Sequence, residues 1–307
     1  MMKEKELINI IKSTLKSDYI GDDCAYLKDL GIVVTQDSLV EDVHFKLDYT
    51  SAFQLGYKSV MVNISDVCAS GAKPKYLTIS LSLPKYIDED FVQEFDKGAQ
   101  KACEGVEIVG GDLTGSDKVF ISVTAIGSTK GRKISSRANA KEGYKIIVSG
   151  EHGNSAKGLE ILLANSSLKQ KDLKEGEKFI QAHLMPVAQR EFSRQIAENI
   201  ARDYAMMDTS DGLADALMQI AKASGVTLCV NSEKIPHDKN VDLSTVLFGG
   251  EDYQLVAVVP DEILQYVSDY TIIGKVEGKT PAIKLDNRLI TDVDNKLYNH
   301  FKEENEQ

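Results

Sequence analysis

The sequence predicts a two-domain fold of the α/β (α+β) class, and three observations lead to this prediction. The chain has 307 residues, a length at which one hydrophobic core commonly gives way to two. Short β-branched runs alternate with segments of helical periodicity in both halves. A basic segment poor in apolar residues, 128–141 (STKGRKISSRANAK), separates the halves. We therefore expect one domain over residues 1–135 and a second over residues 136–307.

The first half is expected to open with a helix and to continue with strands and helices in turn. Residues 1–18 interleave charges with apolar residues such as Leu7, Ile11 and Leu15, which is typical of an amphipathic helix and not of a signal sequence. Residues 31–35 (GIVVT) predict a buried strand that ends at a polar cluster. The elements expected next are a helix from Phe53 to Gly71, a strand at 76–83, a helix capped by Asp88, and strands at 106–109 and 119–126.

The helix from Phe53 to Gly71 carries an unusual polar stripe beside its apolar face. Ser59, Asn63, Asp66 and Ser70 recur at helical spacing, and no Lys or Glu stands among them. A solvated helix face normally carries such charges. The stripe therefore indicates a lone carboxylate turned toward a site.

The second half repeats the alternation of strands and helices. Strands are expected at 145–149, 226–230, 253–259 and 271–273. Helices are expected near 158–163, 187–202, 211–224 and 261–267.

Composition narrows the classes of partner. A formal net charge of −11 argues against nucleic acid or an anionic membrane as the main partner, since both require clustered Lys and Arg. The four cysteines are scattered without a C-x-x-C pair, which favours reduced thiols in the cytoplasm. No apolar run approaches the roughly 20 residues of a membrane span. We expect a cytoplasmic protein that binds neither nucleic acid nor membrane.

Carboxylates gather in short clusters that we expect at the ends of strands. The clusters are Gly21-Asp22-Asp23, Thr35-Gln36-Asp37-Ser38, Gly110-Gly111-Asp112, Asp208-Thr209-Ser210-Asp211-Gly212 and Gly249-Gly250-Glu251-Asp252. Any one of them alone is more simply a turn or a helix cap. Together with Asp66 they supply hard oxygen donors without His or Cys, which is the ligand chemistry of magnesium and not of zinc. Magnesium in turn implies phosphates.

Ser210 and Asp211 precede a segment of helical periodicity and so stand at the start of a helix. Such a start offers unpaired N–H groups to an anion. A plain helix cap is the alternative interpretation.

Eight segments, taken in order, resemble the thiamine-monophosphate kinase family, whose superfamily also holds aminoimidazole ribonucleotide synthetase, selenophosphate synthetase and a hydrogenase maturation protein. The segments are IGDDCA, TQDSLVEDVHF, NISDVCASGAKP, GGDLTGS, SSRANAKEG, DTSDGL, GGEDYQL and LYNHF, and they run from Ile20 to Phe301. The resemblance implies an N-terminal mixed-sheet domain that binds ATP and pairs with a second copy in a homodimer, and a C-terminal α/β domain. It also implies direct in-line transfer of the γ-phosphate of ATP to thiamine monophosphate, assisted by several Mg²⁺ ions.

The resemblance assigns roles residue by residue, without a separate catalytic residue, because the attacking phosphate oxygen is already ionised. The implied metal ligands are Asp23, Thr35, Gln36, Asp37, Asp66, Asp112, Asp208 and Asp211. The implied ATP contacts are Gly111, Asp112, Arg137 and Ser210, and the implied substrate contacts are His44, Glu251 and Tyr298. Gln36 departs from the family, which usually has Ser or Thr there, so a contact through its side chain would use an amide carbonyl.

Two alternatives stay open at this point. The first is a metal-free α/β binding module whose acidic clusters are only turns. The second is an ATP-dependent synthetase of the same superfamily that acts on an amide or on selenide, for which Cys24 is a weak pointer.

Overall fold

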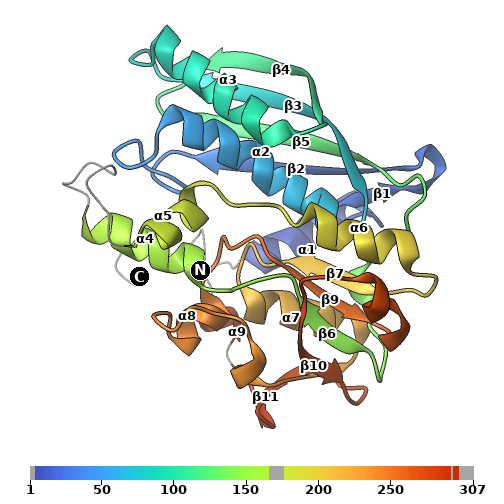
Figure 1. Cartoon of the computed structure of the whole chain (residues 1–307). Coiled ribbons are helices and arrows are strands. Elements are labelled where there is room, and N and C mark those ends of the chain that lie inside the picture. The colour runs from blue at the N-terminus through green and yellow to red at the C-terminus, as the bar shows by residue number, and fades with distance from the viewer. Residues whose placement is uncertain (1–3, 166–175, 292, 297–307) are drawn as a thin grey trace.

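The computed structural model describes residues 4–165, 176–291 and 293–296 (Figure 1). The elements of the first half are α1 (Glu4–Leu15), β1 (Ala25–Leu27), η1 (Lys28–Leu30), β2 (Ile32–Val40), α2 (Ala52–Ala69), β3 (Lys73–Leu83), α3 (Glu89–Cys103), β4 (Glu107–Gly115) and β5 (Phe120–Ser128). Those of the second half are η2 (Arg137–Asn139), β6 (Lys145–Val148), α4 (Asn154–Ala164), α5 (Glu177–Leu184), α6 (Arg190–Asn199), β7 (Ala205–Asp208), α7 (Leu213–Ser224), β8 (Thr227–Val230), η4 (Ser232–Lys234), α8 (Leu243–Phe248), β9 (Leu255–Val259), η5 (Asp261–Tyr266), β10 (Thr271–Val276), β11 (Ala282–Leu285), β12 (Arg288–Leu289) and α9 (Val293–Lys296).

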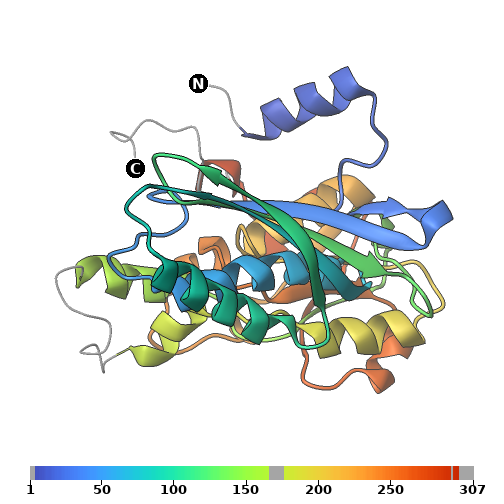
Figure 2. The ribbon, with the colours of Figure 1, turned by 90° about the horizontal axis from the view of Figure 1, so that it is seen from above.

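The first half forms a five-stranded mixed sheet in the order β1-β2-β5-β3-β4. Its strands pair antiparallel except β3 and β4, which are parallel. Helices α2 and α3 cover one face, and Figure 2 shows α1 standing apart on the other side of the sheet. The α2-facing residues of β5, such as Ile121 and Val123, are buried, whereas Phe120 on the other face is exposed. One face of this sheet is therefore packed and the other is open.

Helix α2 lies between the two halves and is buried almost all round. Ser51 caps it with a capping box to Gln54, which satisfies orphan N–H groups of its first turn. The apolar core around Ile64 of α2 runs on without a break to Leu255 and Val259 of β9. A polar side chain on this helix is consequently held away from water and needs a partner.

The second half forms a seven-stranded sheet in the order β12-β11-β8-β10-β6-β9-β7. Helix α7 packs on one face through Leu217 and Ile220, in a core that includes Val256 and Val258 of β9. The alternate residues of β9 face the first half. Strand β7 ends at Asp208, opposite Leu255, so that its last residue points to the junction of the two halves.

The two-domain mixed α/β class is confirmed, but two strand boundaries were wrong. Strand β2 does not end before its acidic cluster, because it stays paired with β5 as far as Val40. Strand β4 likewise continues through Gly110 and Gly111, because an edge strand needs pairing on one side only. Position 111 has to be glycine, since a Cβ there would clash with the Ile79 carbonyl.

Several short elements also differ from expectation. The helix expected at 261–267 is the 3₁₀ helix η5, and α5, α8, β11 and β12 were not anticipated. Each is too short for its periodicity to stand out. Among the described residues, none of the helices is both long and apolar enough to cross a bilayer.

Candidate active site

Three aspartates from distant parts of the chain meet at the junction of the two halves. Asp23 precedes β1, Asp66 lies on α2 and Asp208 ends β7. One carboxylate oxygen of each lies within 4.8 Å of those of the other two. The tertiary fold thus gathers three of the predicted ligands into one cluster.

Hydroxyl groups hold two of these carboxylates in place. Thr35 Oγ1 donates to Asp66 Oδ2 at 2.6 Å. Ser65 Oγ and Ser210 Oγ donate to the two oxygens of Asp208, at 2.7 and 2.9 Å. Orientation by hydrogen bonds is what a preformed ligand cage requires.

Asp37 joins the cluster from β2, and Gln36 does not. Burial foremost, followed by the Asp37 charge, raises the pKa of Asp66, so the two carboxylates lie near each other. The Asp37 N–H donates to Asn63 Oδ1 of the polar stripe at 2.9 Å. Gln36 points to the opposite face of the sheet, where its Oε1 accepts from Thr124 at 2.9 Å, because strand side chains alternate. Its role as a ligand stays a prediction that would require its amide to leave Thr124.

The electrostatics of the cluster call for a cation. Burial, followed by the Asp208 charge and opposed by Arg137, raises the pKa of Asp23 to about 6. Burial and the Asp23 charge raise the pKa of Asp37 to about 6. Burial foremost also raises the pKa values of Asp66 and Asp208. Carboxylates that repel one another in a dry site are stabilised by a divalent ion, and oxygen donors of this kind fit Mg²⁺.

We predict that the metal-free D37N variant melts several degrees above the wild type at about pH 7.5, and that this gain disappears near pH 4. In the folded protein the pKa of Asp37 is about 6, above its ordinary 3.8, so the folded state holds this proton more tightly than the unfolded chain. The wild type therefore loses stability as the pH rises through this range, and Asn has no charge to bury. Thermal melts in chelator across the pH range measure the difference. A gain independent of pH would contradict the assignment.

Arg137 closes one side of the cluster and is suited to an anion. Its Nη2 donates to Asp23 Oδ1 at 2.9 Å, and its main-chain N–H donates to Asp22 Oδ1 at 2.7 Å. Its buried Nε has no hydrogen-bond partner among the described residues. A buried donor of this kind is expected to meet a ligand or a water, and a phosphate oxygen fits a guanidinium.

A second group of polar residues, around Glu251, lies next to the cluster. The Glu251 N–H donates to Ser210 O at 2.6 Å. Burial would raise the pKa of Glu251, but the charge of Lys58 and, to a smaller extent, that of nearby His44 lower it. Burial foremost, followed by the charges of Glu251 and Asp37, raises the pKa of Tyr253, so its ring lies near both groups. Two of the predicted substrate contacts, His44 and Glu251, are thus brought together beside the carboxylates.

Besides Gln36, three predicted residues are not brought into the cluster, and one more is not described. Asp112 is in register with Ser80, Ser122 and Ser38 across the sheet, three strand spacings or roughly 14 Å from β2. Asp112 and its neighbour Gly111 are exposed on the edge strand β4. Asp211 is exposed beyond Ser210, and Tyr298 lies outside the described residues.

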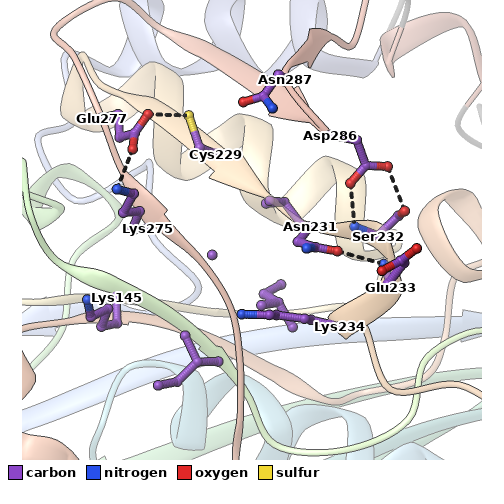
Figure 3. A pocket seen from close by; sticks show the side chains of 14 residues that line it. Lys145, Cys229, Asn231, Ser232, Glu233, Lys234, Lys275, Glu277, Asp286 and Asn287 are labelled. Atoms are coloured by element: carbon purple, nitrogen blue, oxygen red, sulfur yellow. Dashed lines mark hydrogen bonds and ion pairs between the residues drawn. The ribbon is translucent and has the colours of Figure 1, made fainter.

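A hollow of about 750 Å³ lies elsewhere, on the β8–β10 part of the C-terminal sheet (Figure 3). Lys275 Nζ pairs with Glu277 at 2.6 Å, and Cys229 Sγ donates to the same carboxylate. None of the predicted site residues lines it. Its charges largely neutralise one another, so we do not assign the chemistry to it.

Sequence reasoning missed some of the residues that build the site. Ser65 stands beside the polar stripe and gave no periodic signal of its own. Lys58 did give a signal in the sequence, because α2 carries only two charged residues, Lys58 and Asp66. The structure buries Lys58 and brings Asp66 into the site. Partners such as His183 and Tyr253 depend on contacts between distant segments, which spacing along the chain does not encode.

The fold and the carboxylate cluster define the class to which the protein belongs. Residues 21–129 match the family described as AIR synthase related protein, N-terminal domain, and residues 141–284 match its C-terminal domain. The chain is a two-domain member of the AIR synthase related proteins.

Individual relatives narrow the class. A thiamine-monophosphate kinase from Aquifex aeolicus is 38% identical over 290 residues, covering 88% of this chain and 90% of the relative. One from Bacillus subtilis is 34% identical and covers 92% of this chain and 93% of its own. A solved structure named "AaThiL complexed with AMPPCP and TMP" superposes with a TM-score of 0.88 at 35% identity, over 97% of both chains. The chain belongs to the thiamine-monophosphate kinase family, which confirms the resemblance found in the sequence.

Proposed function

We propose that this protein transfers the γ-phosphate of ATP to thiamine monophosphate, with Mg²⁺ ions held by the carboxylate cluster. The observation that carries the proposal is the convergence of Asp23, Asp66 and Asp208, with Arg137 on one side and Glu251 on the other. A related structure named for both AMPPCP and TMP supports the pair of substrates. ATP as co-substrate and four free cysteines fit a cytoplasmic enzyme.

The residues of the cluster fit Mg²⁺ by their donor chemistry. We assign Asp23, Asp37, Asp66 and Asp208 to hold it, with the hydroxyl of Thr35 beside them. Bound there, Mg²⁺ would neutralise phosphate oxygens that otherwise repel each other and would orient them for reaction. Asp211 is the remaining candidate ligand at the start of α7.

The residues of this chain then act mainly by positioning. Arg137 and Ser210 orient the phosphates of ATP, and His44 and Glu251 hold the second substrate against them. In a direct in-line transfer, an oxygen of the monophosphate forms the new bond to the γ-phosphorus as the bond to the β-phosphate oxygen breaks, leaving ADP. That oxygen is already ionised, so the chain needs no general base.

We further propose that the enzyme is a homodimer formed through the open face of the N-terminal sheet. Large apolar side chains are exposed on its strands and on α1, which stands on the same side (Figure 2). These residues are Ile8, Ile10, Ile11 and Leu15 of α1 and Tyr76 and Phe120 of the strands. Exposed apolar surface of this extent is typical of an interface. Because Gly111 and Asp112 are about three strand spacings from β2 within their own chain, we propose that in the dimer these two residues of β4 complete the site of the second copy.

The test is to incubate the purified protein with ATP, Mg²⁺ and thiamine monophosphate and to separate the products by chromatography. We expect thiamine diphosphate and ADP in equal amounts, and no reaction in excess chelator. Free phosphate without thiamine diphosphate would favour a synthetase of the same superfamily. Calorimetry that shows ATP binding without any dependence on metal, together with no turnover, would favour a binding module.

A further inference from the structure

A buried lysine on the metal-bearing helix has no part in the chemistry described so far. Lys58 of α2 is 1% exposed, and its Nζ lies 3.1 Å from Glu251 Oε1. A buried ammonium is costly unless it is paired and hydrogen-bonded. The pair joins the N-terminal half to the 249–253 segment of the C-terminal half.

The other oxygen of Glu251 is held from a third element. His183 Nδ1 of α5 lies 3.4 Å from Glu251 Oε2 and 3.0 Å from Ser155 Oγ. Burial and the Lys58 charge lower the pKa of His183 to about 4, so its ring is neutral and can donate from Nδ1. Each carboxylate oxygen therefore has a buried partner.

The main chain of Glu251 is also fixed in an unfavourable conformation. Its φ is +64°, in the left-handed region that residues with a Cβ rarely adopt, and its N–H is held by Ser210 O. Such strain persists only where the surroundings enforce it, and it is concentrated at functional sites. The side chain of Glu251 nevertheless remains 26% exposed, so its carboxylate is fixed by buried partners and is still accessible to a ligand.

The neighbouring charge of Lys58 keeps the Glu251 carboxylate ionised, so that it accepts hydrogen bonds. Burial by itself would raise the pKa of Glu251, but the charge of Lys58 foremost outweighs burial and lowers it below its ordinary value. A fixed, ionised carboxylate accepts hydrogen bonds and does not donate them. The Glu251 carboxylate therefore favours a ligand that presents an N–H to it and disfavours one that presents a carbonyl at the same place.

We infer that Lys58 is a positioning residue that aims Glu251 at the amino-bearing ring of the thiamine substrate, with His183 fixing the second carboxylate oxygen. This inference rests on the proposed function and adds to it the origin of ring specificity. It also makes α2 a rigid link, because Lys58 and Asp66 stand eight residues or roughly 12 Å apart on one helix. The ring and the phosphates are thereby held in a fixed relation.

The test is steady-state kinetics on K58M, which removes the charge and keeps the chain length. We expect the KM for thiamine monophosphate to rise about tenfold or more, the value of a hydrogen bond to a charged group, while kcat and the KM for ATP change less than about threefold. Preference over an analogue whose ring carries a carbonyl in place of the amino group should fall by a similar factor. K133M, which breaks the more exposed Lys133–Asp203 pair of 2.8 Å, is the matched control and should leave all of these values unchanged.

A double variant separates positioning from mere stabilisation. If Lys58 acts through Glu251, K58M/E251Q should have the same KM for thiamine monophosphate as E251Q alone. Three outcomes would overturn the inference. They are equal rises of the KM for thiamine monophosphate and the KM for ATP in K58M, additive effects of the two substitutions in K58M/E251Q, and an unchanged preference of K58M for the amino-bearing ring. Wild-type protein that does not phosphorylate thiamine monophosphate would instead overturn the proposed function.

Two further variants keep the inference testable if K58M does not fold. K58R retains the charge and should preserve most of the substrate preference. H183N removes the partner of the other oxygen and should raise the KM for thiamine monophosphate alone. Wild-type behaviour of H183N, or an equal effect of K58R on both substrates, would count against the inference.

Discussion

Replacing Asp66 by Asn should lower turnover by at least about a thousandfold while leaving the protein folded. Asp66 stands within 4.8 Å of both Asp23 and Asp208, so it faces whatever ion the cluster holds. An amide keeps the shape and can still accept from Thr35, but it removes one charge from a site that must offset several phosphate charges. The measurement is the rate of thiamine diphosphate formation at saturating ATP, Mg²⁺ and thiamine monophosphate.

The fold of D66N should not suffer, because burial and its charged neighbours raise the pKa of Asp66 and make the ionised group unfavourable in the metal-free protein. Its metal-free melting temperature should match or exceed that of the wild type. Calorimetry should show weaker Mg²⁺ binding. D203N is the matched control, since Asp203 pairs with Lys133 on the surface and should be dispensable. Activity near that of the wild type in D66N would refute the metal assignment.

The carboxylate cluster could be predicted from sequence because its residue types carry their own signal. Asp66 stood out as a charge on a stripe of small polar groups, and the resemblance tied it to Asp23 and Asp208. The spacing of residues along the sequence could not predict the hydrogen bonds that hold these carboxylates in place. The hydrogen bond from Ser65 to Asp208 spans 143 positions, and nothing near Ser65 in the sequence indicates it.

The errors in the predicted fold also have a physical cause. Gly and Asp ordinarily favour turns, so 110–112 was expected to follow a strand. On an edge strand, pairing with β3 outweighs that preference, and glycine is what permits the close approach to Ile79. The same pairing places Asp112 on the face of the sheet away from Asp37, which local propensity cannot foresee.

The position of Asp112 leads to the second large expected effect. If Asp112 binds metal at all, it must do so in a second copy, since roughly 14 Å of sheet separates it from the β2 carboxylate within one chain. D112N and D66N should each be nearly inactive as homodimers. A purified D112N/D66N heterodimer, by contrast, should regain about half of the wild-type rate.

The arithmetic follows from two-fold symmetry. In that heterodimer one site combines both substitutions, and the other combines an intact Asp66 with an intact Asp112. The heterodimer is isolated by co-expression with two different tags and tandem purification, and its rate is compared with wild type carrying the same tags. A D37N/D66N heterodimer is the matched control: Asp37 and Asp66 lie in the same chain's cluster, so each site keeps one defect and no activity returns. An inactive D112N/D66N heterodimer, or an active D37N/D66N heterodimer, would show that the site is not shared between copies in this way.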